Sequence, residues 1–336
     1  MAALKEVNQP ADTFKQVPGK IRGITRIGDL LDGAYVGPIT ISVASFPYTA
    51  EYLLQEVTGR FDIYAPNLTS IPANAFREAV AVDTFYAPEV TSVGANAFDM
   101  GDSDSWKSPG IRSFIAPKCT SFGANAFEGC HYLTNVICNA ASLENNYLLN
   151  GCINLENLET APLTSIGYYT LNNCQKLKHL NLSPTSVSFG EYACRNCYSL
   201  EIDSWPASVR VSKYCFANCQ AITNVNELIN RWTTSATEGI FQNCKGLTKI
   251  QAENITAINS PYLFDECSGV TNIWLPNLTA LANANNCYQM FDSMTSLKTV
   301  YMPKLTTIGV GNGYDSFDYG MANWAAVEEL EFPSLT

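Results

Sequence analysis

Large apolar residues recur along this chain at steps of about 22 residues from residue 61 onward. Most of them stand three positions before a cysteine or another small residue. The landmark positions are Phe76, Phe98, Phe127, Leu149, Leu171, Cys194, Phe216, Phe241, Phe264 and Phe291. A unit of this length cannot bury its apolar face alone, so the pattern predicts a solenoid of stacked repeats.

Alternating apolar and polar residues predict one short strand in each repeat, with the apolar side chains facing the core. The clearest examples are residues 177–182, 247–252, 270–275 and 297–302. A proline follows many of these strands and ends them, because proline cannot donate to a sheet ladder. A second short extended piece comes next, for example at 68–71, 90–93, 278–281 and 305–308. The segment that then carries the landmark residue is expected to form one helical turn that ends near the cysteine.

The chain divides into three expected parts. Residues 1–20 are polar, contain two prolines and predict an extended N-terminal arm. Residues 21–60 predict an N-terminal cap with one degenerate repeat, because an open solenoid end would expose its core. Residues 61–336 are the repeats. Since residues 332–336 begin another repeat, we expect either a truncated chain or a partner that covers this end.

One recurring motif resembles the BspA-like leucine-rich repeat family. It stands here as Val90-Thr-Ser-Val-Gly-Ala-Asn-Ala-Phe98 and as Cys119-Thr-Ser-Phe-Gly-Ala-Asn-Ala-Phe-Glu-Gly-Cys130. The resemblance covers about residues 61–336 and implies adhesion to host proteins or partner recognition, without catalytic residues. The expected fold class is therefore an α/β-type solenoid: a right-handed leucine-rich-repeat stack with a parallel β-sheet face, short strands and short helical turns.

Charge and hydropathy narrow the classes of partner. The net charge is −11, and lysine and arginine form no cluster that would bind nucleic acid or an anionic membrane. No apolar stretch is long enough to span a bilayer, and residues 1–20 lack the apolar run of a signal peptide. We expect an extracellular-facing protein on a virion or cell surface, with a cytoplasmic location as the alternative.

Seven cysteines share one phase of the repeat: Cys130, Cys152, Cys174, Cys197, Cys219, Cys244 and Cys267. Equivalent positions stack at the spacing of neighbouring strands, so the pattern predicts a ladder of buried free thiols; disulfides along the ladder are the alternative. The two histidines, His131 and His179, fall in different phases, which argues against a catalytic arrangement. The sequence therefore predicts no enzyme, no cofactor and no metal site.

The outward row of the predicted sheet is the first candidate binding surface. It carries the aromatic residues Tyr86, Trp274 and Tyr301 among amide and hydroxyl side chains. Exposed aromatic residues in such surroundings are typical of protein and glycan recognition. Packing between neighbouring rungs is the alternative explanation for them.

Insertions in one phase of the repeat are the second candidate. They lie at about 229–238, 282–289 and 309–316, and they contain Trp232, Tyr288 and Tyr314. Insertions in one phase project from one edge of a solenoid, which is often the binding edge. Random tolerance of surface loops to insertion is the alternative.

These observations favour a non-enzymatic recognition or adhesion protein. Its ligand would be a protein or glycan on a host or neighbouring surface. Its N-terminal region would fix it to a structural partner in a larger assembly, either a phage or virus-particle appendage or a bacterial cell surface. A purely structural scaffold or decoration protein without a host ligand is the alternative function, and homo-oligomerisation remains open.

Overall fold

The computed structural model describes residues 5–7, 38–41, 43–45, 54, 60–101, 110–235, 237–281, 289–308, 324 and 326–334. The chain divides into two compact units, Met1–Ser183 and Pro184–Thr336. We call them the first and second units and describe each by itself.

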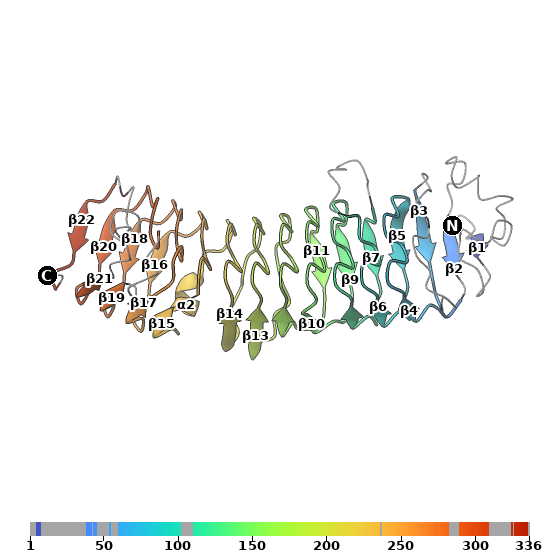
Figure 1. Ribbon diagram of the computed structural model, residues 1–336, viewed down its shortest axis with the longest axis horizontal. Coiled ribbons are helices and arrows are strands. Elements are labelled where there is room, and N and C mark those ends of the chain that lie inside the picture. Colours follow the sequence, from blue (N-terminus) through green and yellow to red (C-terminus); the bar gives the residue numbers. More distant parts are fainter. Residues whose placement is uncertain are drawn as a thin grey trace. The chain divides into compact units, whose positions relative to one another are not determined.

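The first unit contains a seven-stranded parallel sheet with neighbours in the order β1-β2-β3-β5-β7-β9-β11 (Figure 1). These strands are β1 (Lys5–Val7), β2 (Ile39–Ile41), β3 (Phe61–Tyr64), β5 (Val82–Tyr86), β7 (Ser113–Ile115), β9 (Asn135–Ile137) and β11 (Asn157–Glu159). Two-residue strands form further parallel ladders in this unit. They are β4 (Ser70–Ile71), β6 (Ser92–Val93) and β8 (Ser121–Phe122) in one ladder, and β10 (Ser142–Leu143) with β12 (Ser165–Ile166) in another.

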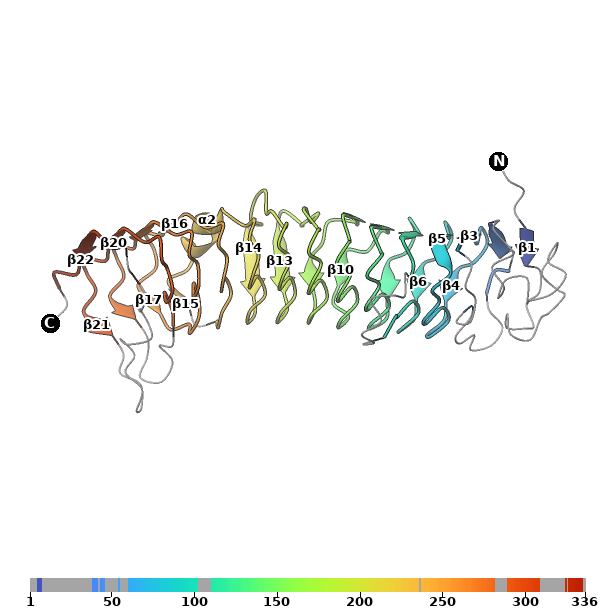
Figure 2. The ribbon, with the colours of Figure 1, turned by 90° about the horizontal axis from the view of Figure 1, so that it is seen from above.

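The second unit is built in the same way. Its wider sheet contains β16 (Lys249–Gln251), β18 (Asn272–Trp274), β20 (Thr299–Tyr301) and β22 (Glu329–Glu331). A narrower sheet contains β15 (Thr234–Ser235), β17 (Ala257–Ile258), β19 (Ala280–Leu281) and β21 (Thr307–Ile308), and β13 (Ser186–Phe189) pairs with β14 (Ser208–Val211). In Figure 2, β16, β20 and β22 lie on one side of this unit, and β15, β17 and β21 lie on the other.

The strands confirm the parallel sheet that the alternating pattern predicted, although they are shorter than expected. In β16, β18 and β20 the central residue is buried, whereas the residues on either side are half-buried or exposed. The second extended pieces are also present, for example β4 within 68–71 and β19 within 278–281. Each unit is therefore a parallel β-solenoid.

One predicted strand is wrong. Residues 177–182 contain only an isolated parallel bridge, between Leu182 and Leu163. In a regular rung the residue that follows the strand donates to the last strand residue of the next rung, as Cys138 N–H does to Glu159 O at 2.9 Å. Here Leu163, three residues further along, donates to Asn181 O instead, at 2.7 Å. This shift in the pairing removes the regular ladder, although the residues alternate as a strand would.

The expected helical turn around the landmark residue is also wrong, since this segment is a tight turn without helix. Asn74 and Glu78, on either side of Phe76, have left-handed backbone φ angles of 56° and 57°. Left-handed residues interrupt a right-handed helix, and here Phe76 N–H donates across to Ala97 O of the next rung at 2.7 Å. In the second unit the same pairs of left-handed positions are Tyr192 and Asn196, Tyr214 and Asn218, and Tyr262 and Glu266. Among the described residues the single α-helix is α2 (Val225–Ile229), which lies elsewhere in the repeat.

Stacked phenylalanines fill the core of each unit. In the first unit, Phe98 lies between Phe76 and Phe127, with ring centroids 5.3 and 5.2 Å away. Phe216, Phe241, Phe264 and Phe291 form a second column, with centroid separations of 6.0, 5.8 and 6.0 Å. Burial of each ring contributes about 1.5–3 kcal/mol, and a favourable aromatic pair adds about 0.5–1.5 kcal/mol. Because these contacts join neighbouring rungs, stability accumulates rung by rung.

The cysteine ladder consists of buried free thiols, and the alternative of disulfides is wrong for the cysteines that the structure describes. Six thiols of the ladder donate to the carbonyl of a landmark residue on the preceding rung, as Cys130 Sγ does to Phe98 O at 3.1 Å; the others are Cys152, Cys174, Cys219, Cys244 and Cys267. Cys244 Sγ donates to Phe216 O in the same way, at 3.2 Å. Burial raises the pKa of Cys244 to about 12. These cysteines therefore pack as small apolar side chains, and hydrogen bonds to backbone carbonyls satisfy most of their thiols.

Candidate recognition surfaces

The outward row of the second unit carries two stacked aromatic residues. Parallel pairing places Gln251, Trp274, Tyr301 and Glu331 side by side on successive strands. The rings of Trp274 and Tyr301 are 6.3 Å apart at their centroids, and their planes differ by 10°. Both residues are only half-buried, so packing between rungs leaves part of each aromatic surface open to solvent. We call these two residues the aromatic pair.

A helix replaces the strand on the rung before β16. Val225, Leu228 and Ile229 are all buried, and their spacing is that of one face of a helix. Glu227 and Arg231 form an ion pair across one turn on the opposite, solvent side. The core-facing residues of this rung thus follow a helical period, and α2 packs against β16, whereas β16, β18 and β20 pair strand with strand.

A polar groove of about 240 Å³ lies between α2 and the end of β16. It is lined by Asn226, Glu227, Asn230, Gln251, Ala252 and Glu253. Asn226 Oδ1 accepts from Gln251 N–H at 2.8 Å, and Asn230 Oδ1 accepts from Glu253 N–H at 2.6 Å. These bonds fix both asparagine side chains. Gln251 links this groove to the aromatic pair, because it directly precedes Trp274 in the row.

In the first unit, the predicted residue Tyr86 is 37% exposed. It stacks on Tyr64 of the preceding strand, with ring centroids 5.3 Å apart and an interplanar angle of 23°. The sequence interpretation missed Tyr64, although it occupies the same outward position one repeat earlier. The first unit therefore has two stacked aromatic residues of its own, Tyr64 and Tyr86, separate from Trp274 and Tyr301.

The insertions predicted at one edge of the solenoid contribute little to the surface that the structure describes. Trp232 is half-buried, and its ring stacks on the core residue Phe241 with a centroid distance of 6.5 Å. Part of the indole of Trp232 therefore packs against the core. Tyr288 and Tyr314 lie outside the described residues, together with most of 282–289 and all of 309–316.

Sequence reasoning also missed a set of tyrosines at the left-handed turn positions. In the second unit, Tyr192 and Tyr214 stack with centroids 5.3 Å apart and an interplanar angle of 1°. Tyr214 Oη donates to Glu238 Oε1 at 2.7 Å, and Lys213 Nζ lies 3.0 Å from the other oxygen of that carboxylate. Burial opposes ionisation of Glu238, but the hydrogen bonds from Tyr214 and Lys213 outweigh it and lower the pKa of Glu238. The signal was available, since tyrosine stands two residues before the landmark in several repeats.

These tyrosines border a second polar groove, of about 500 Å³, in the same unit. Arg195 and Gln242 also line it, and the guanidinium of Arg195 lies 5.4 Å from the centre of the Tyr192 ring. Lys213 and Glu238 already pair with each other, and Arg195 lies over the Tyr192 ring. This arrangement stabilises the turn edge of the solenoid.

The repeat pattern and the stacked rungs point to one family. The model of the BspA-type leucine-rich repeat region, with six copies, matches residues 102–223 and 204–312, which together make up more than half of the chain. This chain belongs to the BspA-type leucine-rich repeat family. The resemblance inferred from the motifs at 90–98 and 119–130 is thereby confirmed, as is the solenoid fold class.

The chain is similar to several solved structures, of which the first described here supports the fold. A leucine-rich repeat protein from Bacteroides ovatus ATCC 8483 is 17% identical with a TM-score of 0.53, and the match covers 98% of this chain and 92% of that chain. A leucine-rich cell surface protein from Faecalibacterium prausnitzii A2-165 is 16% identical with a TM-score of 0.31, over 86% of this chain and 81% of that one. The pneumococcal vaccine antigen PcpA is 14% identical with a TM-score of 0.38, over 90% and 76%. No curated protein matches the chain.

Membership of this family also indicates which kinds of activity are typical. BspA-type repeats often serve surface adhesion or protein binding, leucine-rich repeat proteins are typically not enzymes, and no catalytic family is indicated for this chain. Within the described residues, no helix has the length and apolar character that a bilayer crossing requires.

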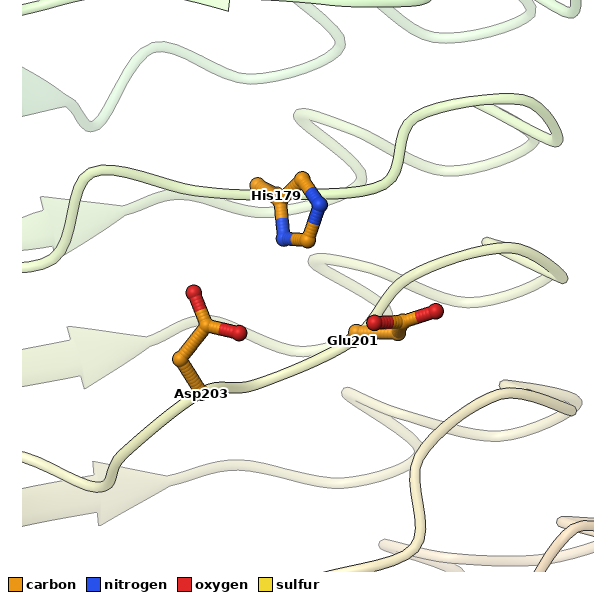
Figure 3. Close-up of side chains that lie close together, drawn as sticks. All are labelled: His179, Glu201 and Asp203. Carbon is orange, nitrogen blue, oxygen red and sulfur yellow. The ribbon is translucent and has the colours of Figure 1, made fainter.

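Three exposed side chains of the kinds that bind metals appear in Figure 3: His179, Glu201 and Asp203. His179 belongs to the first unit, whereas the two acidic residues belong to the second. We consider each in its own unit and assign no joint site to them. The other histidine, His131, lies in the turn after Cys130, where burial lowers its pKa.

Proposed function

We propose that this BspA-type protein is a non-catalytic recognition protein that acts in adhesion at an extracellular-facing surface. In this proposal the second unit binds a ligand on its outward sheet row. The observation that carries it is the aromatic pair, Trp274 and Tyr301, whose stacked rings remain open to solvent on a rigid strand pair. Rigid aromatic residues supply a large contact area at low entropic cost, and they dominate many binding hot spots.

The surroundings of the aromatic pair fit an interface rather than a catalytic site. Asn272 and Thr299 pair on the neighbouring outward row, where Asn272 Nδ2 donates to Thr299 Oγ1. Lys249 and Glu329 occupy the two ends of that row. This polar rim around an aromatic centre is the usual anatomy of a recognition surface.

Attachment to a larger assembly is the second part of the proposal. β1, in the expected N-terminal arm, pairs with β2 in the expected cap. β1 is the end strand of its sheet within the described residues, and an unpaired strand edge offers backbone donors and acceptors to a partner. We propose this edge as the attachment region of the protein on a cell surface or particle.

Binding of the purified full chain to immobilised mucin, collagen and laminin tests the recognition function. We expect the wild type to bind at least one of these surfaces. The double variant Trp274→Ala/Tyr301→Ala should lose binding by at least about tenfold, the effect of removing about 1.4 kcal/mol. The control variant Tyr198→Ala removes a tyrosine that is 42% exposed outside the row, and it should bind as the wild type does.

Two results contradict the proposal. Unchanged binding by the double variant would place the interface elsewhere on the molecule. Absence of wild-type binding to all three surfaces would favour the alternative function, a structural scaffold without a host ligand.

A further inference from the structure

We propose that the groove between α2 and β16 binds a neutral saccharide, with one sugar ring in the groove and the next ring against Trp274. This inference rests on the proposed recognition function and specifies its ligand class.

Asn226 and Asn230 take the place of backbone carbonyls that a regular rung supplies to the next strand. In a regular rung, N–H groups of a strand donate to backbone carbonyls of the preceding rung, as Asn157 N–H of β11 does to Thr134 O at 3.0 Å. α2 uses its backbone carbonyls within the helix, so it cannot serve β16 in this way. The side-chain oxygens of Asn226 and Asn230 accept the N–H groups of Gln251 and Glu253 instead.

This arrangement leaves hydrogen-bond donors on both asparagine side chains. An asparagine amide has two donors besides its oxygen. Since the oxygens of Asn226 and Asn230 are held by the backbone, their Nδ2 groups are fixed as well, and no described residue accepts from them. The side chain of Gln251 adds a third amide, and the carboxylates of Glu227 and Glu253 add acceptors. Fixed groups of both kinds complement sugar hydroxyls, each of which donates and accepts.

The charged side chains at the groove restrict the class of ligand. The Glu227 carboxylate is paired with Arg231, and Glu253 remains as a second negative charge at the groove. Anionic ligands are therefore disfavoured. A cationic ligand would meet the carboxylates but would leave the three amides without acceptors, and unsatisfied polar groups in an interface cost affinity. A neutral polyhydroxyl ligand satisfies both sets of groups.

The volume and position of the groove fit one sugar ring. The groove, at about 240 Å³, is smaller than the roughly 300–1,000 Å³ that is usual for drug-sized ligands, so it suits a single ring. Tyr301 stacks on Trp274 from β20, and the strand on the other side of Trp274 is β16, whose Gln251 lines the groove. An indole face at the end of a polar groove packs against the apolar C–H face of the adjoining sugar ring.

The test uses the full chain and saturation-transfer NMR with methyl glycosides of glucose, galactose, mannose and N-acetylglucosamine, and with their disaccharides. N-acetylneuraminic acid and a lysine-rich peptide serve as the anionic and cationic probes. We expect binding of at least one neutral glycoside, tighter binding of the corresponding disaccharide, and weaker or absent binding of both charged probes.

The decisive variant is Asn226→Asp/Asn230→Asp. Each aspartate keeps the oxygen that accepts the backbone N–H groups and removes the Nδ2 donors, so the fold should be retained while saccharide affinity falls at least tenfold. The variant Gln251→Met removes the third amide without touching either asparagine and should lower affinity several-fold. The charge-matched control, Asn139→Asp/Asn146→Asp at two exposed positions of the first unit, adds the same two negative charges and should bind as the wild type does.

The outcomes separate this inference from the proposed function. If the aromatic pair is needed for binding to mucin or matrix protein, but no neutral glycoside binds or the double aspartate variant binds it unchanged, the saccharide assignment is overturned and the recognition function stands. Preferential binding of the acidic sugar or of the basic peptide overturns the assignment as well. Loss of glycoside binding in the aspartate variant with retained helical and strand signals in circular dichroism supports it.

Discussion

The buried carboxyl of Asp265 should make the stability of the second unit depend on pH. Asp265 is 3% exposed, and its Oδ2 accepts from Gln242 Nε2 at 2.9 Å. Burial raises the pKa of Asp265 from its ordinary value of 3.8 to about 6; the bond from Gln242 opposes this rise, and the carboxylates of Glu266 and Asp292 reinforce it. The neutral form is therefore the one that the folded state favours.

The sign of the effect follows from proton binding. Between pH 3.8 and about 6, the folded state holds a proton on Asp265 that the unfolded state has released. The stabilisation is complete below pH 3.8 and is lost as the pH rises through about 6. A pKa difference of one corresponds to about 1.4 kcal/mol, so the full rise sets an upper limit of about 3 kcal/mol. Relaxation and hydration around the ionised carboxylate reduce the expected effect to about 1–2 kcal/mol.

Asp265→Asn tests this reasoning because the amide cannot ionise and still accepts from Gln242. In urea unfolding followed by circular dichroism, the variant should match the wild type at pH 4 and exceed it by about 1–2 kcal/mol at pH 8. The control Glu329→Gln removes a carboxylate from an exposed strand position and should stay within about 0.5 kcal/mol of the wild type at both pH values. Equal stability of Asp265→Asn and the wild type at pH 8, or an Asp265 pKa near 3.8 in a carbon-13 NMR titration, would refute the argument.

Three further predictions concern the repeat itself. Phe98→Ala should lower the free energy of unfolding by about 3–5 kcal/mol, whereas Phe98→Leu should cost about 1 kcal/mol because leucine holds the same position at Leu149; urea unfolding measures both, and similar losses would contradict the packing account. Gly239→Ala should destabilise the second unit by at least about 1 kcal/mol, since the new Cβ would lie 2.1 Å from a ring atom of Tyr214 at a φ of +59°; an unchanged melting temperature would contradict this. In a Cys287→Ser background, the eleven buried cysteines should not react with a thiol reagent at pH 8 until the protein unfolds, and labelling of the native protein would show that the ladder opens.

The parallel sheet could be predicted because one physical rule governs it. Residues 270–275 and 297–302 alternate in the chain, and β18 and β20 bury the central residue that this alternation selects. The phase of the cysteines likewise predicted their burial, since equivalent positions in a stack share one environment. The burial of a residue at a regular repeat position can therefore be predicted from the sequence of that repeat alone.

Other features depended on the neighbouring rung, which no single repeat reveals. The segment around Phe76 has good helix formers, but Asn74 and Glu78 adopt left-handed conformations that let alternate N–H groups reach the next rung. Residues 177–182 alternate as a strand, yet Leu163 rather than the expected donor pairs with Asn181. In both cases bonding between rungs overrode the local preference.

The helix α2 has a regular local pattern, but its effect depends on bonding to the neighbouring rung. It explains why an interruption of the repeat can generate the binding site that we propose. Replacing one strand by a helix leaves the next strand with N–H groups that only side chains can satisfy. Aspartate or serine could accept those bonds as well, but aspartate would add no donor, and serine would add a single rotatable hydroxyl. Asparagine at positions 226 and 230 accepts the bonds and presents rigid donors to solvent at the same time. The repair of the backbone ladder thus builds the polar half of the site, and the adjoining rungs supply its aromatic half in Trp274 and Tyr301.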